Sequence, residues 1–207
     1  MKDFHESLTI TIVLYKENFE LISKCLDQIK NFKVIIIDNG ADLNLQKKIQ
    51  SKYKIFKYVL NDKNLGFSKG INQAIKLTNT ELILNLEADC LIDEENIFKL
   101  YEAINSYQRC VMAVPTMFDE NNQLTQSGGL LMEKNLGYKA LKFDGDVCVD
   151  FPSTAAVLFK RKEILDIGLF DEDLFIYFPD SEIGRRVKKN KKSVIQVFES
   201  KALHTMG

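Results

Sequence analysis

Several kinds of residue on which common classes of site depend are scarce in this sequence. It has four cysteines without a Cys-x-x-Cys pair and only two histidines, which argues against a zinc site. No G-x-G-x-x-G follows the first predicted strand and no G-x-x-x-x-G-K-[ST] occurs, which excludes a dinucleotide-binding loop and a P-loop. The net charge is −1, so charge gives no reason to expect a nucleic-acid partner.

Long apolar segments are also missing. No run approaches the roughly 18 residues that a membrane-spanning helix needs, and the first residues, "MKDFHESL", lack the apolar core of a signal peptide. Because the cysteines show no pairing pattern, a reducing cytoplasm is the expected location. What is present, 207 residues of which 45% are hydrophobic and 28% charged, fits one globular domain.

Apolar strands alternate with amphipathic helices in the first half of the chain. The predicted strands are "LTITIVL", "KVIIID", "FKYVL", "ELILNL" and "CVMAV". The helix after the first strand places Ile22, Cys25, Leu26 and Ile29 on one face, and residues 66–77 form a second amphipathic helix. The helix after the fourth strand places Ile97, Leu100, Tyr101 and Ile104 inward. This alternation predicts an α/β fold with a parallel sheet covered by helices on both faces.

The alternation ends after Pro115. "FDENNQLTQSGGLL" predicts a hairpin or excursion, and "YKALKFDGDVCVDF" predicts irregular or antiparallel structure. A strand and a short helix ending at Gly168 follow, then a helix over residues 180–192 and a last strand over 193–199. Because no linker, repeat or low-complexity segment is present, we expect one domain over residues 1–207.

Polar residues follow four of the predicted strands at their carboxyl ends, where open parallel sheets bind ligands. These residues are Tyr15, Lys16 and Glu17; Asp38, Asn39 and Gly40; Asn61, Asp62 and Asn64; and Glu87 and Asp89. Taken singly, Asp38-Asn39-Gly40 is a turn and Asn64 is a helix cap. Their convergence on one edge of the sheet favours a binding site.

Glu87 and Asp89 end a buried strand, where an ionised carboxylate needs a metal, a cationic side chain or contact with water. Without a P-loop, the phosphates of a bound nucleotide need a metal or Lys/Arg to neutralise them. Carboxylates at a strand tip can hold Mg²⁺ or Mn²⁺, which in turn bridges phosphate groups.

The chain also resembles a known family. "TIVLYKEN", "IIIDNG", "NLGFSKGINQAI", "LILNLEAD", "STAAVLFKRKEILDIGLFDEDLFIYFPDSEIGRR" and "ALH" are similar, in this order, to blocks of the family 2 inverting glycosyltransferases. The most similar subgroup is the rhamnosyltransferase-like enzymes of bacterial surface polysaccharides. The resemblance implies a GT-A fold, with a Rossmann-like, mostly parallel central sheet and a smaller antiparallel excursion. It also implies nucleotide-diphosphate sugar donors and a Mg²⁺ or Mn²⁺ cofactor.

The resemblance assigns a first set of residues to the nucleotide sugar. Tyr15 and Glu17 correspond to positions at the base and ribose, and Asp38 to an acceptor for a pyrimidine ring N–H. The remaining residues on the nucleotide side are Asn64, Gly66, Lys69 and Asn72. Residues 1–114 would then form the nucleotide-sugar-binding half, and residues 115–207 the acceptor-binding and catalytic half.

A second set is assigned to metal binding and catalysis. Glu87-Ala88-Asp89 occupies the DxD position, with Asp89 as metal ligand and Glu87 near the ribose or a metal-bound water. His204 would complete the metal shell, Asp180 would be the general base, and Glu182 matches the second acid of the "ED" motif. The alternatives from the residues alone are a helix cap for Asp180 and a surface position for His204.

Two positions depart from the family pattern: Glu87 replaces the usual Asp, and Pro179 stands where Glu is usual. "DGD" at 144–146 and "DED" at 171–173 also spell DxD, and we interpret both as loop acids. The expected reaction moves a hexose from a UDP- or dTDP-sugar to a saccharide or lipid-linked saccharide. The alternatives are a non-catalytic nucleotide-sugar-binding module and a sugar-nucleotide pyrophosphorylase, although the Gly-rich, Arg-bearing loop of the latter is missing.

Six basic residues lie within Arg185–Lys192. Such a run predicts a solvated helix face or, in combination with residues 160–162, peripheral contact with the inner face of the membrane. The sequence stops three residues after His204. We therefore expect either that it belongs to a longer protein or that acceptor recognition involves a homo-oligomer or a partner chain.

Overall fold

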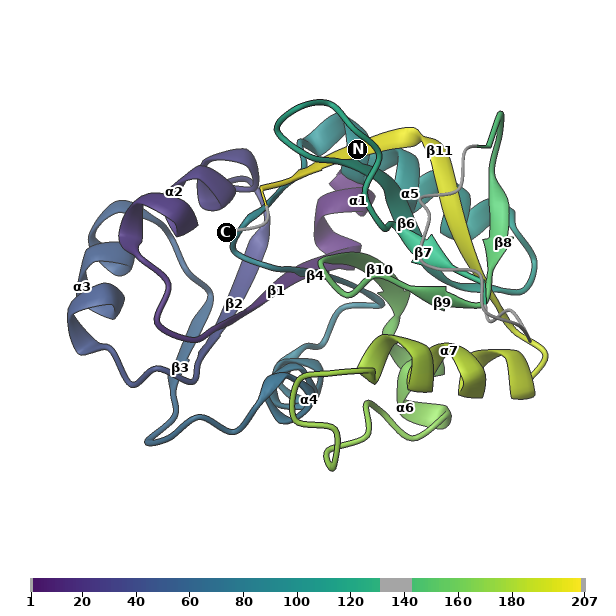
Figure 1. Cartoon of the computed structure of the whole chain (residues 1–207). Helices are drawn as coiled ribbons and strands as arrows, with labels where there is room; N and C mark the ends of the chain where they lie inside the picture. Colours follow the sequence, from purple (N-terminus) through teal and green to yellow (C-terminus); the bar gives the residue numbers. More distant parts are fainter. Residues whose placement is uncertain (1, 131–142, 206–207) are drawn as a thin grey trace.

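A nine-stranded sheet crosses the molecule in the computed structural model, which describes residues 2–130 and 143–205 (Figure 1). Its strands are β1 (Leu8–Leu14), β2 (Lys33–Asp38), β3 (Lys57–Leu60), β4 (Leu82–Leu86), β5 (Cys90–Leu91), β6 (Cys110–Phe118), β8 (Val147–Val149), β10 (Ala156–Lys160) and β11 (Ser193–His204). Their order is β3-β2-β1-β4-β10-β6-β11-β5, and β8 pairs with β11. The five strands predicted in the first half are therefore all present.

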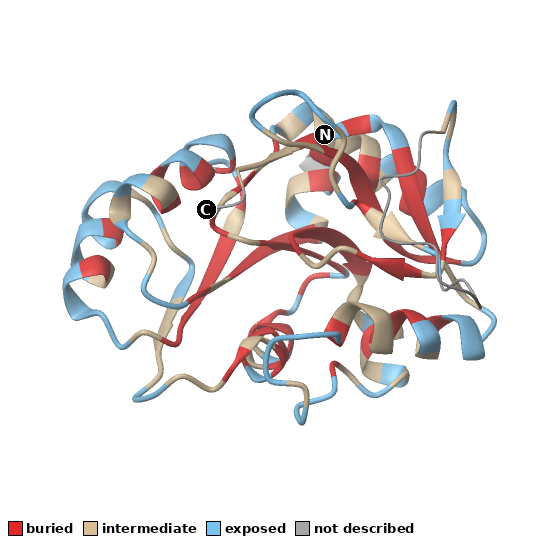
Figure 2. Cartoon of the chain, viewed as in Figure 1, coloured by how far each residue is buried: buried red, intermediate tan, exposed pale blue. Residues whose placement is uncertain are grey.

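The first four strands of this order are parallel to one another. β6 and β11 run in the same direction as these four strands. β10 is antiparallel to both of its neighbours, β4 and β6, and β11 is parallel to β6. The central strands β1, β2 and β4 are buried along almost their whole length and consist mainly of apolar residues, because the sheet is covered on both faces (Figure 2). The prediction of an α/β fold around a mostly parallel sheet is confirmed.

Helices cover both faces of the sheet. One face packs against α1 (Lys2–Ser7), α2 (Phe19–Gln28), α3 (Leu43–Lys52) and α5 (Glu94–Ser106), and the other against α4 (Phe67–Leu77), α6 (Arg161–Asp166) and α7 (Pro179–Lys189) (Figure 1). The sequence reading missed α1 and α3. In α3 only Leu45 and Ile49 are buried, so the apolar spacing is weak, and the start of the helix is set by Asp42, which accepts the backbone N–H groups of Asn44 and Leu45. Among the described helices, none has the length and apolar content needed to cross a bilayer.

The second half of the chain is interwoven with the first, because β10 lies between β4 and β6. The predicted hairpin after β6 is a tight turn closed by a bridge between Phe118 and Leu124. The predicted antiparallel structure is present as β8 and as β9 (Phe151–Pro152), which pairs with β7 (Gly128–Gly129). The parts of both predictions that fall on residues 131–142 lie outside the described residues.

The last two predicted elements have different bounds in the structure. The helix begins one residue earlier, at Pro179, and ends at Lys189 rather than residue 192. The final strand continues beyond residue 199 to His204, because an irregularity between Val197 and Lys201 shifts the register with β6 and lets pairing resume. This extension brings the end of β11 alongside β5.

Candidate active site

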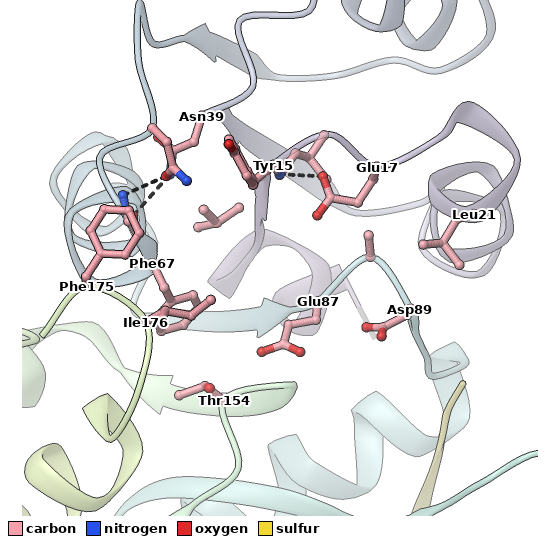
Figure 3. A pocket seen from close by; sticks show the side chains of 15 residues that line it. Tyr15, Glu17, Leu21, Asn39, Phe67, Glu87, Asp89, Thr154, Phe175 and Ile176 are labelled. Carbon is pink, nitrogen blue, oxygen red and sulfur yellow. Dashed lines mark hydrogen bonds between the residues drawn. The ribbon is translucent and has the colours of Figure 1, made fainter. Parts of the chain in front are cut away.

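A cavity of about 300 Å³ lies beyond the carboxyl ends of β1, β2 and β4 (Figure 3). Its polar lining residues are Tyr15 and Glu17 after β1, Asn39 after β2, Asn64 before α4, Glu87 and Asp89 after β4, and Thr154 before β10. The apolar wall includes Leu21, Phe67, Phe175 and Ile176. The structure thus brings six of the assigned site residues to one cavity: Tyr15, Glu17, Asn64, Gly66, Glu87 and Asp89.

The turn after β4 is held in place by backbone hydrogen bonds. The N–H of Glu87 donates to the carbonyl of Ala155 (2.9 Å), and the N–H of Cys90 donates to the carbonyl of Glu87 (3.1 Å). The chain then enters β5, where Cys90 pairs with His204 at the end of β11. This pairing places a histidine from the end of the chain next to the carboxylates that follow β4.

Glu87, Asp89 and His204 form a cluster in which the three potential ligand atoms lie within 4.8 Å of one another. The Nε2 atom of His204 is 3.6 Å from an oxygen of Asp89 and 3.8 Å from an oxygen of Glu87. Thr205 fixes this end of the strand, because its N–H and hydroxyl both donate to the carbonyl of Asp89. Two carboxylates and an imidazole at this spacing match the ligand types of a divalent metal site.

Negative charge accumulates at the cavity. Burial raises the pKa of Glu87, and the nearby carboxylates of Asp89, Asp180 and Glu17 raise it further, while His204 lowers it. Burial also raises the pKa of Glu17, whose carboxylate accepts the backbone N–H of Tyr15. The pKa of His204 is raised by its interaction with Asp89. A cation in the cavity would relieve this repulsion.

The loops on the nucleotide side are tied together by amide side chains. Asn39 donates to the carbonyl of Gly66 (3.1 Å), Asn61 donates to Asn39 (2.9 Å), and Asn64 accepts the N–H of Gly66 (2.9 Å). Gly66 has a positive φ of 83°, and a Cβ at this position would meet Phe175 at 2.5–2.7 Å. Glycine is therefore required where the α4 loop meets the second half of the chain.

Three residues assigned to the nucleotide lie away from the cavity lining. Asp38 is buried, and its carboxylate accepts the hydroxyl of Tyr58 (2.7 Å) and the N–H of Gly40 (2.7 Å). Asn72 is also buried and exchanges hydrogen bonds with both backbone groups of Phe170. Lys69 is exposed on α4. Each carboxylate oxygen of Asp38 already accepts one hydrogen bond, so a base can bind only to the lone pairs that are left. The amide of Asn72 holds the chain before α7 through Phe170.

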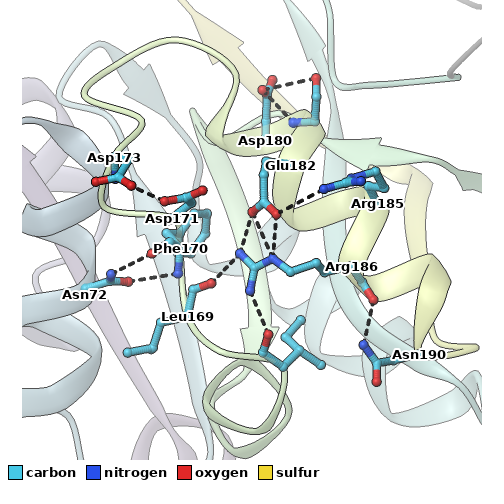
Figure 4. A network of polar contacts seen from close by, with 12 residues as sticks. Asn72, Leu169, Phe170, Asp171, Asp173, Asp180, Glu182, Arg185, Arg186 and Asn190 are labelled. Carbon is cyan, nitrogen blue, oxygen red and sulfur yellow. Dashed lines mark hydrogen bonds and ion pairs between the residues drawn. The ribbon is translucent and has the colours of Figure 1, made fainter.

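Asp180 and Glu182 lie in the first turn of α7 but have different surroundings (Figure 4). Asp180 accepts the N–H of Ser181 (2.7 Å), and burial raises its pKa. Glu182 binds Arg186 through both carboxylate oxygens, and Arg186 also donates to the carbonyls of Ile167 and Leu169. The carboxylate of Asp180 is close enough to Glu87 to raise the pKa of Glu87. Glu182 instead binds an arginine that holds the chain before α7.

The two other DxD sequences lie elsewhere. In the first, Asp146 accepts the N–H of Phe198 and the hydroxyl of Tyr107. In the second, Asp171 is exposed and accepts the N–H of Asp173. Neither contributes to the Glu87–Asp89–His204 cluster, in agreement with their interpretation as loop acids.

Sequence reasoning missed the contribution of the second half to the cavity wall. Thr154 lies in the segment before β10, whose position beside β4 no local pattern predicts. Phe175 and Ile176 belong to "FIYF", four consecutive large apolar residues outside any helix or strand. That run was a usable signal, since such residues are normally buried unless they bind something.

Part of the basic run Arg185–Lys192 is paired. Arg186 binds Glu182, Lys188 lies 2.6 Å from Asp150, and Lys192 lies 3.2 Å from Glu163. These pairs reduce the positive charge available to a membrane surface. Membrane contact through this run stays a prediction.

Sequence comparisons point to one family. The family model described as "Glycosyl transferase family 2" matches residues 9–165. The poly-beta-1,6-N-acetyl-D-glucosamine synthase of Staphylococcus aureus (strain COL) is 24% identical over 181 residues, covering 82% of this chain and 43% of that protein. The synthase of the same name from Staphylococcus epidermidis is 22% identical over 178 residues with the same coverage. This chain spans less than half the length of these curated relatives.

Solved structures share the fold over nearly the whole chain. GalNAc-T7 with UDP, GalNAc and Mn²⁺ superposes with a TM-score of 0.78 at 16% identity, covering 96% of this chain and 44% of that one. The mannosyltransferase PcManGT from Pyrobaculum calidifontis, in complex with GDP-Man and Mn²⁺, gives 0.70 at 12% identity, covering 97% and 57%. TarS of S. aureus gives 0.68 at 20% identity, covering 97% and 37%. At these identities the likeness concerns the fold.

Proposed function

Because this chain belongs to glycosyl transferase family 2, we propose that it transfers a hexose with inversion from a UDP- or dTDP-sugar to a saccharide or lipid-linked saccharide. Its fold is of the GT-A type. The names of its curated relatives support a role in bacterial surface polysaccharide synthesis. Family membership also favours sugar transfer over the pyrophosphorylase alternative.

One observation carries the proposal. Among the described residues, the cavity contains Glu17, Glu87 and Asp89 in its lining and no lysine or arginine. A nucleotide diphosphate is itself an anion, so this cavity would repel it unless a cation neutralised both partners. Asp89 and His204, with Glu87 beside them, have the ligand types and the spacing to hold Mg²⁺ or Mn²⁺.

The general base in this proposal is Asp180. The acceptor hydroxyl oxygen forms a bond to the anomeric carbon as the bond from that carbon to the diphosphate oxygen breaks. The hydroxyl proton passes to the Asp180 carboxylate, whose raised pKa makes it a stronger base than an ordinary aspartate. Attack on the face opposite the diphosphate inverts the anomeric centre. A divalent cation would supply positive charge to the departing diphosphate.

The remaining residues act in binding. Tyr15 and Glu17 would contact the base and ribose from the loop after β1, and Asn64 and Gly66 would contact the nucleotide from the loop before α4. Residues 1–114 would supply most of the donor site and residues 115–207 the acceptor site. Phe175 and Ile176, from the second half of the chain, also line the cavity that would hold the donor.

Turnover tests the proposal. The purified chain is incubated with UDP-, dTDP- and GDP-sugars, a pool of free and lipid-linked saccharides, and Mn²⁺ or EDTA. We expect acceptor-dependent release of nucleoside diphosphate from a UDP- or dTDP-sugar that stops with EDTA, and NMR of the product should show the inverted anomer. Binding of a nucleotide sugar without turnover on any acceptor would instead support the non-catalytic alternative.

A further inference from the structure

The segment that joins Phe170 to α7 exposes four consecutive apolar side chains, Phe175, Ile176, Tyr177 and Phe178. Tyr177 and Phe178 are the two most exposed large apolar residues of the described chain, at 74% and 67%. Other exposed large apolar residues of the described chain, such as Phe56, occur singly. Contiguous exposed apolar surface of this kind usually marks a binding site.

The segment is anchored at both ends. On one side, the carbonyl of Phe175 accepts the N–H of Phe67 (2.7 Å), and the Phe175 ring packs over Gly66. On the other side, Pro179 is buried and the carbonyl of Phe178 accepts the N–H of Glu182 (3.0 Å). Tyr177 and Phe178 therefore lie between two anchored ends of the segment. The centroids of their rings are 6.5 Å apart, and the ring planes are inclined by 55°.

Phe178 adopts a left-handed backbone conformation, with φ 69° and ψ 10°. For a non-glycine residue this conformation is unfavourable, and burial of the side chain does not compensate for it here. Folding therefore gains little from an exposed aromatic ring at this position. Strain of this kind is commonly retained where a ligand uses the side chain.

The position of the two rings indicates the ligand. Their neighbours Phe175 and Ile176 line the donor cavity, as Figure 3 shows, and Asp180 follows two residues after Phe178. Residues 171–173 of the same segment are three exposed acids, which oppose an anionic bilayer. Aromatic faces stack on the C–H faces of sugar rings, and the carboxylate of Asp180 can accept a hydrogen bond from a sugar hydroxyl, so the rings and this carboxylate suit a neutral saccharide.

We propose that Tyr177 and Phe178 form an aromatic platform that binds a sugar ring of the acceptor saccharide beside Asp180. This inference rests on the proposed transferase function and adds specific acceptor-binding residues to it. The platform would present the acceptor hydroxyl to Asp180 while the donor occupies the adjacent cavity.

Two variants remove the platform. Tyr177→Ala removes the more exposed ring, and Phe178→Gly removes the other ring while also relieving the left-handed backbone, so it cannot weaken binding through added strain. Phe56→Ala is the matched control, because Phe56 is a comparably exposed aromatic (53%) beside the amino end of β3, at the opposite edge of the parallel sheet.

The probes are pentasaccharides of β-1,6- and β-1,4-linked N-acetylglucosamine and of α-1,4-linked glucose, titrated by NMR into protein saturated with UDP and Mn²⁺. We expect at least one to bind the wild type, with upfield shifts of sugar C–H resonances, since protons over an aromatic face are shielded. Tyr177→Ala and Phe178→Gly should each weaken that binding at least tenfold and abolish the shifts, and Phe56→Ala should change neither.

UDP and Mn²⁺ binding, measured by thermal shift on the same samples, separates the two proposals. If UDP and Mn²⁺ do not bind the wild type, the transferase function itself is contradicted. With UDP binding intact, the platform is overturned if no pentasaccharide binds or if both variants bind as the wild type does. It is also overturned if the wild type binds phosphatidylglycerol vesicles instead and Tyr177→Ala abolishes that binding.

Discussion

His204 lies with its Nε2 atom 3.6 Å from the Asp89 carboxylate because the last residue of β11 pairs with Cys90, the residue directly after Asp89. Strand pairing thus joins the two ends of the site, the turn after β4 and the end of the final strand. The irregularity between Val197 and Lys201 precedes this paired end of β11 and shifts its register with β6.

The first prediction concerns metal binding at this cluster. In the presence of nucleoside diphosphate at about 100 times its Kd, Mn²⁺-dependent binding should stabilise the wild type by about 2.7 kcal/mol. That corresponds to a rise in Tm of roughly 5–10 °C for a chain of this size. Asp89→Ala should abolish the rise, measured by thermal shift with Mn²⁺ and with EDTA.

Asp144→Ala and Asp171→Ala are the controls, because each removes an exposed acid from one of the other DxD sequences. Both variants should keep the Mn²⁺-dependent rise. If one control loses the rise in Tm while Asp89→Ala keeps it, the metal binds at the DxD sequence which that control alters.

The sequence is enough to predict which strand ends carry the site residues. It is not enough to predict which distant segments of the chain contact these strand ends. Glu87 and Asp89 are recognisable because an apolar run ends in two acids, and the parallel order of β1, β2 and β4 brings their ends to one edge. The insertion of β10 beside β4, and with it the position of Thr154, depends on pairing between residues far apart in the chain. Local periodicity contains no information about such pairing.

The same limit applies to the assigned carboxylates on α7. Sequence placed Asp180 and Glu182 together, two residues apart at the start of a helix. The structure separates their surroundings, because Arg186 lies four residues after Glu182 on the same helix face and also reaches the carbonyls of Ile167 and Leu169. The i, i+4 spacing predicts the ion pair, but its link to the preceding segment requires the fold.

The second prediction concerns pH and the metal-free protein. Because the pKa of Glu87 is raised, the folded protein binds the proton of this carboxyl group more tightly than the unfolded chain does. The free energy of unfolding therefore falls as pH rises above 4.5, the pKa in the unfolded chain, and through the pKa in the folded protein. The raised pKa of His204 acts in the same direction, because its contribution is present below 6.5 and lost as pH rises through the folded pKa. In EDTA, the Tm should therefore decrease between pH 5 and pH 8.

Glu87→Gln imitates the protonated side chain and should raise the Tm of the metal-free protein at pH 8, with little effect at pH 4. Glu81→Gln is the matched control, since Glu81 is exposed at the opposite end of β4. A Glu87→Gln variant that is less stable than the wild type at pH 8 in EDTA would show that the carboxylate is stabilised rather than strained in the empty cavity.

The third prediction concerns the nucleotide base. If Asp38 accepts a pyrimidine ring N–H, UDP or dTDP should bind more tightly than GDP. Asp38→Asn keeps an oxygen for the N–H of Gly40 and removes the charge, and a charge-assisted hydrogen bond contributes about 1.5–3 kcal/mol. The variant should weaken UDP binding roughly tenfold to a hundredfold by calorimetry.

Tyr58→Phe serves as the control for Asp38→Asn, because it removes the hydroxyl that donates to Asp38 and leaves the carboxylate in place. It should keep the pyrimidine preference. Equal affinities of the wild type for UDP, dTDP and GDP would contradict a role of Asp38 in base selection.

The fourth prediction decides whether Asp180 is the general base. Asp180→Asn keeps the size of the side chain and an oxygen that can accept the N–H of Ser181, so stability and UDP–Mn²⁺ binding should be retained. Acceptor-dependent release of nucleoside diphosphate should fall by about 10² or more. Because burial raises the pKa of Asp180, the acid limb of the wild-type kcat/KM profile should lie above the pH at which an ordinary aspartate titrates.

Glu182→Gln separates catalysis from positioning on the same helix. Its carboxylate binds Arg186 through both oxygens, so the variant should lower the free energy of unfolding by about 1–3 kcal/mol, measured by urea denaturation, because a charged hydrogen-bonded pair is lost. At a temperature where both variants are folded, Glu182→Gln should retain far more transfer activity than Asp180→Asn, and its acid limb should stay in place. If Asp180→Asn releases nucleoside diphosphate at the wild-type rate while Glu182→Gln does not, then Glu182 is the base and its contact with Arg186 must open during turnover.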